Sequence, residues 1–193
     1  MEYKRYIFLD VDGVLNHPEF YESRRLVGGH LSSHVTHLSS HVDPKCIKLL
    51  NQLEGCEVVM ITSWSHEECM EVLPKLGLKL PVIGGVKARE LAYQWIVRGN
   101  SIAEWFVDNY GSMPRDSFFD SFEPDGWWHP GRNWDFEKGE FRLVKESKFG
   151  ISYVIFDDNA DMLMDQKNHF IHINPHTGIT QEDINKAKQI LNL

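Results

Sequence analysis

The apolar residues of this chain fall mainly in short uninterrupted runs, each followed by polar or acidic residues. The runs lie at residues 6–10, 58–61, 80–83, 153–156 and 170–173. Runs of this length without polar alternation are typical of strands that are buried on both faces. We therefore predict a strand at each run.

Between the runs, amphipathic stretches predict helices. They span residues 43–53, 65–77, 89–107 and 180–191. Asp43 is an acid in the N-cap position and is followed by Pro44, which suits the first helical position. Ser65 and Glu68 have the spacing of a capping box, which marks the start of the second helix. Gly99 lies inside the third stretch and predicts a break in it.

Strands that alternate with helices predict a parallel sheet with helices on both faces. We therefore expect an α/β fold, a Rossmann-like three-layer α/β/α sandwich, built as a single domain over residues 1–193. Two segments lie outside the alternation and are interpreted as small insertions. Residues 17–41 contain a histidine-rich tandem repeat of His-Leu-Ser-Ser-His-Val, and residues 110–147 are rich in aromatic residues, glycine and proline.

The formal charge of −8 and the pI of about 5.6 argue against an extended nucleic-acid interface, because such an interface is basic. A small phosphorylated substrate at a locally positive site remains compatible with this charge. No run reaches the roughly 18 apolar residues of a membrane span, so no membrane partner is expected. The three cysteines have no CxxC spacing and no signal peptide is recognisable, which favours free thiols and a cytoplasmic location. The oligomeric state does not follow from the sequence.

Polar side chains follow three of the predicted strands. Asp10, Thr62 and Asp157 each come at the end of an apolar run, and ligands of parallel sheets bind at the carboxyl ends of the strands. Asp10 and Asp12 are carboxylates one residue apart, and their repulsion is costly unless a cation lies between them. Gly13 suits a tight turn after the strand. The sequence therefore predicts a cation-dependent site at this edge of the sheet.

The segment from Asp10 to Asn16, Asp-Val-Asp-Gly-Val-Leu-Asn, resembles the first signature of the haloacid dehalogenase (HAD) superfamily, DxDGV. Residues 58–63 are similar to the second signature, and residues 153–161 to the fourth, in which paired acids hold Mg²⁺. Residues 98–106 resemble the RGxEIxxWL stretch of small HAD proteins grouped with RNA-repair enzymes, and residues 169–180 resemble their tail. The resemblance covers nearly the whole chain apart from the two insertions.

The resemblance implies that Asp10 is a covalent nucleophile and that Asp12 is a general acid and base. It also implies Mg²⁺ as the cofactor, held at Asp10, Asp12 and Asp157 together with one further acid. Asp158 and Asp161 both match the position of that further acid, and the sequence does not choose between them. Oxygen ligands of this kind are those that Mg²⁺ prefers.

Two more elements of the implied site bind the phosphoryl group. Thr62, with Ser63 as second choice, corresponds to the hydroxyl residue of the second signature. Arg98 corresponds to the cation that neutralises the phosphate, and the rival candidates are Lys87, Lys145 and Lys148.

The implied activity is that of a magnesium-dependent phosphohydrolase, which forms an aspartyl-phosphate and acts on a small phosphorylated metabolite or nucleotide. An acid at the position of Asp12 marks the phosphatases of the superfamily. The first alternative is a phosphatase that processes polynucleotide 3′ ends, which the RNA-repair resemblance suggests and the acidic charge disfavours. The second is a catalytically silent binding module, against which the intact acids argue.

The insertions each have two interpretations. His30, His34, His37 and His41 have a spacing that would align them on one helical face, as a solvated surface or as a metal or substrate contact. The aromatic residues of 110–147 form either a hydrophobic subcore or oligomer contact, or a lid that stacks a nucleobase over the site. They are Phe118, Phe119, Phe122, Trp127, Trp128, Trp134 and Phe136. Tyr21, Arg24 and Arg25 are candidates to contact the distal part of the substrate, or are ordinary surface residues.

Overall fold

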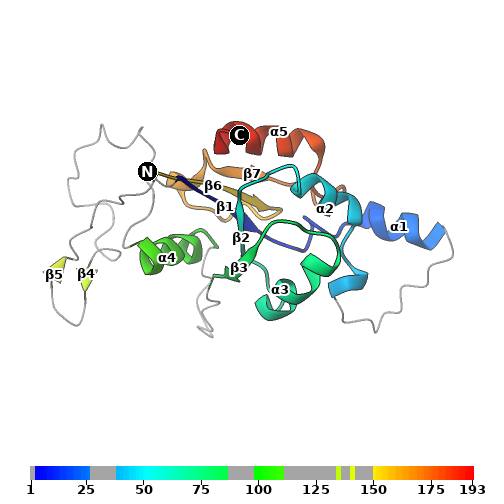
Figure 1. The fold of residues 1–193 in the computed structure, drawn as a ribbon, viewed down its shortest axis with the longest axis horizontal. Helices are drawn as coiled ribbons and strands as arrows, with labels where there is room; N and C mark the ends of the chain where they lie inside the picture. The colour runs from blue at the N-terminus through cyan, green and yellow to red at the C-terminus, as the bar shows by residue number, and fades with distance from the viewer. Residues whose placement is uncertain (1–2, 27–37, 87–97, 111–133, 136–139, 142–149) are drawn as a thin grey trace.

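The computed structural model describes residues 3–26, 38–86, 98–110, 134–135, 140–141 and 150–193. At its centre lies a sheet of five parallel strands in the order β3-β2-β1-β6-β7. The strands are β1 (Tyr3–Leu9), β2 (Glu57–Met60), β3 (Val82–Gly85), β6 (Gly150–Asp157) and β7 (Phe170–His172). The predicted α/β fold around a parallel sheet is confirmed (Figure 1).

Helices cover both faces of the sheet. They are α2 (Pro44–Leu50), α3 (His66–Lys75), α4 (Arg98–Tyr110) and α5 (Gln181–Leu191). Successive side chains of a strand point to opposite faces, so Ile7 and Leu9 pack in one core with α2, α3 and α5. Tyr6 and Phe8 pack in a second core with α4. Figure 1 shows α5 and α4 on opposite sides of the sheet, which makes the three layers.

The caps that the sequence predicts are present in the structure. The Asp43 carboxylate accepts a hydrogen bond from the Lys45 amide at 2.8 Å and so caps α2. The Ser65 hydroxyl accepts from the Glu68 amide at 3.2 Å and caps α3. Thr180 forms a capping box at the start of α5. These bonds satisfy amides that a helix leaves unpaired at its first turn.

Several element bounds differ from the prediction. β1 begins at Tyr3 and not at residue 6, because it pairs with β6 from Gly150 onward. β3 begins at Val82, after Pro81, since proline has no amide to donate to the sheet. α4 begins at Arg98, so Gly99 lies in its first turn. The predicted residues 89–97 lie outside the described part of the chain, and the predicted break at Gly99 stays a prediction.

Within the first predicted insertion, the structure contains α1 (Pro18–Leu26) and the short helix η1 (Leu38–Ser40). No residue of α1 is buried, which explains why the apolar pattern did not predict this helix. Within the second, β4 (Trp134–Asp135) and β5 (Glu140–Phe141) form an antiparallel pair. His30, His34 and His37 lie outside the described residues, and so do Phe118, Phe119, Phe122, Trp127, Trp128 and Phe136.

The register of the central strands places their carboxyl ends together. The amide of Asp10 donates to the carbonyl of Phe156 at 3.1 Å, and the amide of Ile61 donates to that of Leu9 at 2.9 Å. Figure 1 shows β1 running from the amino terminus towards the side of the molecule on which α1 lies. Among the described residues, no helix has the length and apolarity that crossing a bilayer requires.

Candidate active site

Two buried carboxylates and one guanidinium meet at the ends of β1 and β6. Asp10 is 1% exposed and Asp157 is fully buried. Arg98, the first residue of α4, donates through Nη1 to Asp10 Oδ2 and, at 2.7 Å, to Asp157 Oδ2. The structure thus brings together three residues that lie far apart in the sequence.

The surroundings shift the pKa of each group. Burial raises the pKa of Asp10, an effect that hydrogen bonds from Arg98, the Val11 amide and Thr62 partly offset. Burial, together with the negative charge of Asp10, raises the pKa of Asp157 to about 6. Burial opposes the charged form of Arg98, but its bonds to both carboxylates outweigh this and raise its pKa, so the guanidinium stays protonated.

A third carboxylate completes an oxygen-rich cluster at this place. Oxygens of Asp10, Asp157 and Asp158 lie within 4.8 Å of one another. Within the described ranges, three carboxylates meet one guanidinium, that of Arg98, and the resulting excess of negative charge is one that a divalent cation would neutralise. The donors are hard oxygens, as Mg²⁺ requires. The residues at this edge therefore fit the implied cofactor.

Gly13 lies where the loop after β1 approaches the loop after β6. Its φ of +71° lies in the region that side chains disfavour. A Cβ at this position would lie 2.5 Å from Asp158 Oδ2, closer than atoms can approach. The glycine that the sequence assigned to a tight turn therefore also makes room for the third carboxylate.

Asp12 is exposed, unlike Asp10, but two side chains hold its carboxylate. Asn16 Nδ2 donates to Asp12 Oδ1 at 2.7 Å, while Asn16 Oδ1 accepts from the Gly13 amide at 2.9 Å. Trp64 Nε1 lies 3.1 Å from both Asp12 oxygens and donates to them. These hydrogen bonds fix the direction of the carboxylate. Asp12 is therefore an oriented acid that is open to solvent.

Thr62 and Ser63 take different places after β2. Thr62 is 7% exposed, and its hydroxyl hydrogen-bonds to Asp10 and lowers the pKa of that carboxyl group. The Thr62 oxygen also accepts from the Trp64 amide at 3.3 Å. Ser63 is exposed. Of the two candidates, Thr62 is the one that contacts Asp10.

Asp161 fixes the start of α4. Its Oδ2 accepts from the Arg98 amide at 3.0 Å, and its carbonyl accepts from the Gly99 amide at 3.3 Å. A carboxylate in this position also stabilises the positive end of the helix dipole. Asp161 is not one of the three carboxylates within 4.8 Å of one another. The geometry thus gives it a contact with the helix that carries Arg98.

A second contact holds the same turn of α4. Gln166, which is fully buried in the short helix η2 (Met164–Gln166), donates to the Gly99 carbonyl at 2.8 Å and accepts from the Leu163 amide at 2.9 Å. A Cβ on Gly99 would lie 2.4 Å from Gln166 Oε1. The absence of a side chain at Gly99 lets the loop approach the helix and so sets the position of Arg98.

Of the residues that the sequence proposed, Asp10, Asp157, Asp158, Thr62 and Arg98 lie in one cluster, with Asp12 at its open side. The rival cations Lys87, Lys145 and Lys148 lie outside the described residues. Sequence reasoning missed Asn16, Trp64 and Gln166. Asn16 ends the segment that resembles the first signature, and Trp64 directly follows the second, which was the available signal.

Comparison with known proteins bears on the same residues. A family model described as the HAD domain in Swiss Army Knife RNA repair proteins matches residues 6–119. The matched segment contains Asp10, Asp12, Thr62 and Arg98. No curated protein and no solved structure gives a significant match to this chain.

Proposed function

This chain belongs to the family of HAD domains of Swiss Army Knife RNA repair proteins, and we propose that it is a magnesium-dependent phosphatase with Asp10 as nucleophile. Membership of this family indicates a hydrolase of the phosphatase type. The observation that carries the finer proposal is the contact of Arg98 with both Asp10 and Asp157 at the strand ends. That contact puts the candidate nucleophile beside a cation and an acidic ligand cluster.

In the proposed reaction, a carboxylate oxygen of Asp10 attacks phosphorus, and the bond from phosphorus to the leaving oxygen breaks. Asp12 protonates that leaving oxygen and becomes a carboxylate. Asp12 then takes a proton from a water molecule, whose oxygen attacks the aspartyl-phosphate. This second displacement releases phosphate and restores both acids. Covalent catalysis of this kind divides one difficult displacement into two easier steps.

The remaining residues of the cluster stabilise charge during both steps. Arg98 and the Thr62 hydroxyl lie beside Asp10 and are in position to donate to the phosphoryl oxygens. Bound at Asp10, Asp157 and Asp158, Mg²⁺ supplies charge neutralisation for the transferring phosphoryl group. The bonds from Asn16 and Trp64 keep Asp12 directed while it exchanges its proton.

The leading substrate class is a small phosphomonoester, such as a metabolite or a nucleotide. The second candidate is the 3′-phosphate of a polynucleotide, which the description of the matched family favours. The formal charge of −8 disfavours a long polyanionic contact, although an enzyme that binds only a strand end needs few phosphate contacts. Relative rates on nucleoside monophosphates and on a 3′-phosphorylated oligonucleotide distinguish these two substrate classes.

The test compares the wild-type protein with Asp10→Asn on p-nitrophenyl phosphate, nucleoside monophosphates and a 3′-phosphorylated oligonucleotide, each with Mg²⁺ or with EDTA. We expect Mg²⁺-dependent phosphate release by the wild type and none by Asp10→Asn. The matched control is Asp108→Asn, an exposed aspartate in α4, which should retain full activity. Equal activity of Asp10→Asn and wild type would reject Asp10 as the nucleophile, whereas no turnover of any substrate would reject the proposed function and favour a silent binding module.

A further inference from the structure

A row of aromatic rings begins at the proposed catalytic acid and ends on α1. Trp64 donates to both oxygens of Asp12 at 3.1 Å. The Trp64 ring lies 5.6 Å from that of His41, and the His41 ring lies 5.9 Å from that of Tyr21. Phe20 follows at 5.7 Å from Tyr21. Rings at these separations contact one another as aromatic neighbours do in proteins.

Polar bonds as well as ring contacts hold the row. The Tyr21 hydroxyl and His41 Nδ1 are 3.0 Å apart and form a hydrogen bond. Arg24, one turn after Tyr21 in α1, donates to the Ser40 carbonyl at 2.6 Å and lies over the Phe20 ring. These bonds join α1 to the segment around η1, so the rings have a defined arrangement before any ligand binds.

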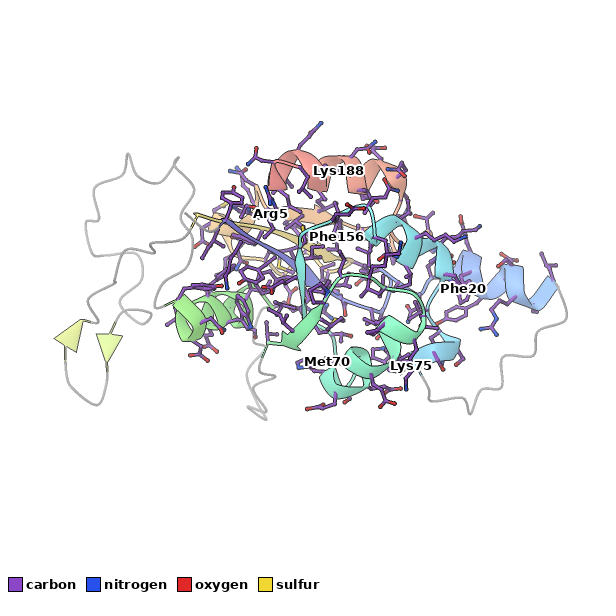
Figure 2. The ribbon with its side chains drawn as sticks, in the orientation of Figure 1. Arg5, Phe20, Met70, Lys75, Phe156 and Lys188 are labelled. Atoms are coloured by element: carbon purple, nitrogen blue, oxygen red, sulfur yellow. The ribbon has the colours of Figure 1, made fainter. Side chains whose placement is uncertain are left out.

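The row also remains accessible. Phe20, Tyr21, His41 and Trp64 are all half-buried, whereas residues of the neighbouring core such as Leu15 and Leu38 are fully buried. Burial, followed by the charge of Asp12, raises the pKa of the Tyr21 hydroxyl, so this ring also lies within the field of the catalytic acid. Figure 2 labels Phe20 on α1, at the end of the molecule away from Arg5 of β1.

The position of Asp12 decides which part of a substrate meets these rings. If Asp12 protonates the leaving oxygen, as the proposed function requires, then that oxygen lies within hydrogen-bond reach of the Asp12 carboxylate. Trp64 donates to the same carboxylate, and His41 and Tyr21 follow Trp64 in the row. The rings are therefore in position to contact the organic part of the phosphomonoester, which begins at the leaving oxygen.

We propose that Tyr21, His41 and Trp64 form a binding site for the nucleobase of the leaving group, which makes a nucleotide the preferred substrate class. The inference rests on the proposed function. A planar base gains from aromatic neighbours whatever its sequence identity, because every base has a π-face. A simple sugar or glycerol phosphate offers no such face. The base belongs either to a mononucleotide or to the terminal residue of a strand, and the two share this chemistry.

The experiment compares kcat/KM for adenosine 5′-monophosphate and for ribose 5-phosphate, which share the leaving oxygen and differ by the base. We expect the wild type to prefer the nucleotide by at least about tenfold, and Tyr21→Leu to reduce this ratio about tenfold. Tyr21→Phe keeps the ring and should retain the ratio. Tyr3→Leu makes the same substitution at the amino end of β1, whereas the site lies at its carboxyl end, and this variant should also retain the ratio. A 3′-phosphorylated dinucleotide, measured beside the mononucleotide, distinguishes the two sources of the base.

A wild-type ratio near one, or an unchanged ratio in Tyr21→Leu, would overturn the inference while leaving the phosphatase proposal intact. No residue of α1 is buried, so substitution of Tyr21 does not open the core. If no substrate is hydrolysed, the proposed function fails, and calorimetric binding of the two ligands to wild type and Tyr21→Leu tests the ring site by itself. Tighter binding of the nucleotide that depends on the Tyr21 ring would support the site, and equal binding would reject it.

Discussion

Arg98 Nη1 lies 2.7 Å from Asp157 Oδ2, so the first residue of α4 is paired with the last residue of β6. The same nitrogen donates to Asp10. Two acids that would repel each other in a buried site therefore share one positive charge. The balance of charge within this cluster is the basis for the effects that we expect on turnover, on stability and on Mg²⁺ binding.

Replacement of Arg98 tests its contribution directly. We expect Arg98→Ala to lower kcat by about 10²–10³, the usual effect of removing one donor that stabilises transition-state charge. Arg98→Lys should recover part of the rate, because an ammonium keeps the charge but cannot form the same set of bonds. Steady-state kinetics with p-nitrophenyl phosphate measure both. Activity of Arg98→Ala close to that of the wild type would exclude Arg98 and favour one of Lys87, Lys145 and Lys148.

The raised pKa of Asp157 predicts how stability depends on pH without metal. Its value of about 6 in the folded protein exceeds the usual 3.8, so the native state binds this proton more tightly than the unfolded state does. The resulting stabilisation is present below about pH 4 and is lost as the pH rises through 6. Thermal melts in EDTA should therefore show that the stabilisation from Asp157 is lost between about pH 4 and pH 6. Asp157→Asn should remove this dependence and raise Tm at pH 7.5.

Mg²⁺ should reverse the loss where the carboxylates are ionised. A ligand that binds only the folded state at about 100 times its Kd stabilises by about 2.7 kcal/mol. We expect the increase in Tm on adding Mg²⁺ to be larger at pH 7.5 than at pH 5, since protons compete for Asp157 at the lower pH. An equal increase at both pH values, or none at either, would contradict binding at this cluster.

Asp158 and Asp161 should respond differently to substitution. Asp158 lies in the carboxylate cluster, so Asp158→Ala should weaken Mg²⁺ binding. Asp161 caps α4, so Asp161→Ala should lower kcat by displacing Arg98 and should leave Mg²⁺ affinity nearly unchanged. Calorimetric titration of Mg²⁺ into each variant, combined with kinetics, separates the two roles. Weaker Mg²⁺ binding in Asp161→Ala than in Asp158→Ala would reverse the assignment.

Gly13 and Gly55 form a matched pair for the loop that bears Asp12. Their φ values are +71° and +78°, but a Cβ on Gly13 would meet Asp158 at 2.5 Å, while one on Gly55 would meet nothing within 4 Å. We expect Gly55→Ala to cost about 1–2 kcal/mol of unfolding free energy from backbone strain alone. Gly13→Ala should cost about 1–3 kcal/mol more, from the clash. Urea unfolding measures both, and equal costs would show that the loop relaxes.

The succession of strands and helices along the chain could be predicted from the sequence. Unbroken runs such as residues 153–156 predict burial on both faces, and Asp43 and Ser65 mark the starts of the helices that they cap. Asp10, Thr62 and Asp157 were placed at one edge because parallel strands end together. These features are local, so a short segment carries the whole signal. The helix α1 was missed because it has no buried face to leave an apolar pattern.

What the sequence determined about this protein is therefore the set of groups available at the strand ends. What only the tertiary structure decided is which of those groups touch. Trp64 meets Asp12, Asp161 meets Arg98, and Gln166 meets Gly99, in each case across more than 50 residues of chain. Such contacts depend on the exact approach of separate loops, which close packing fixes and no single segment encodes.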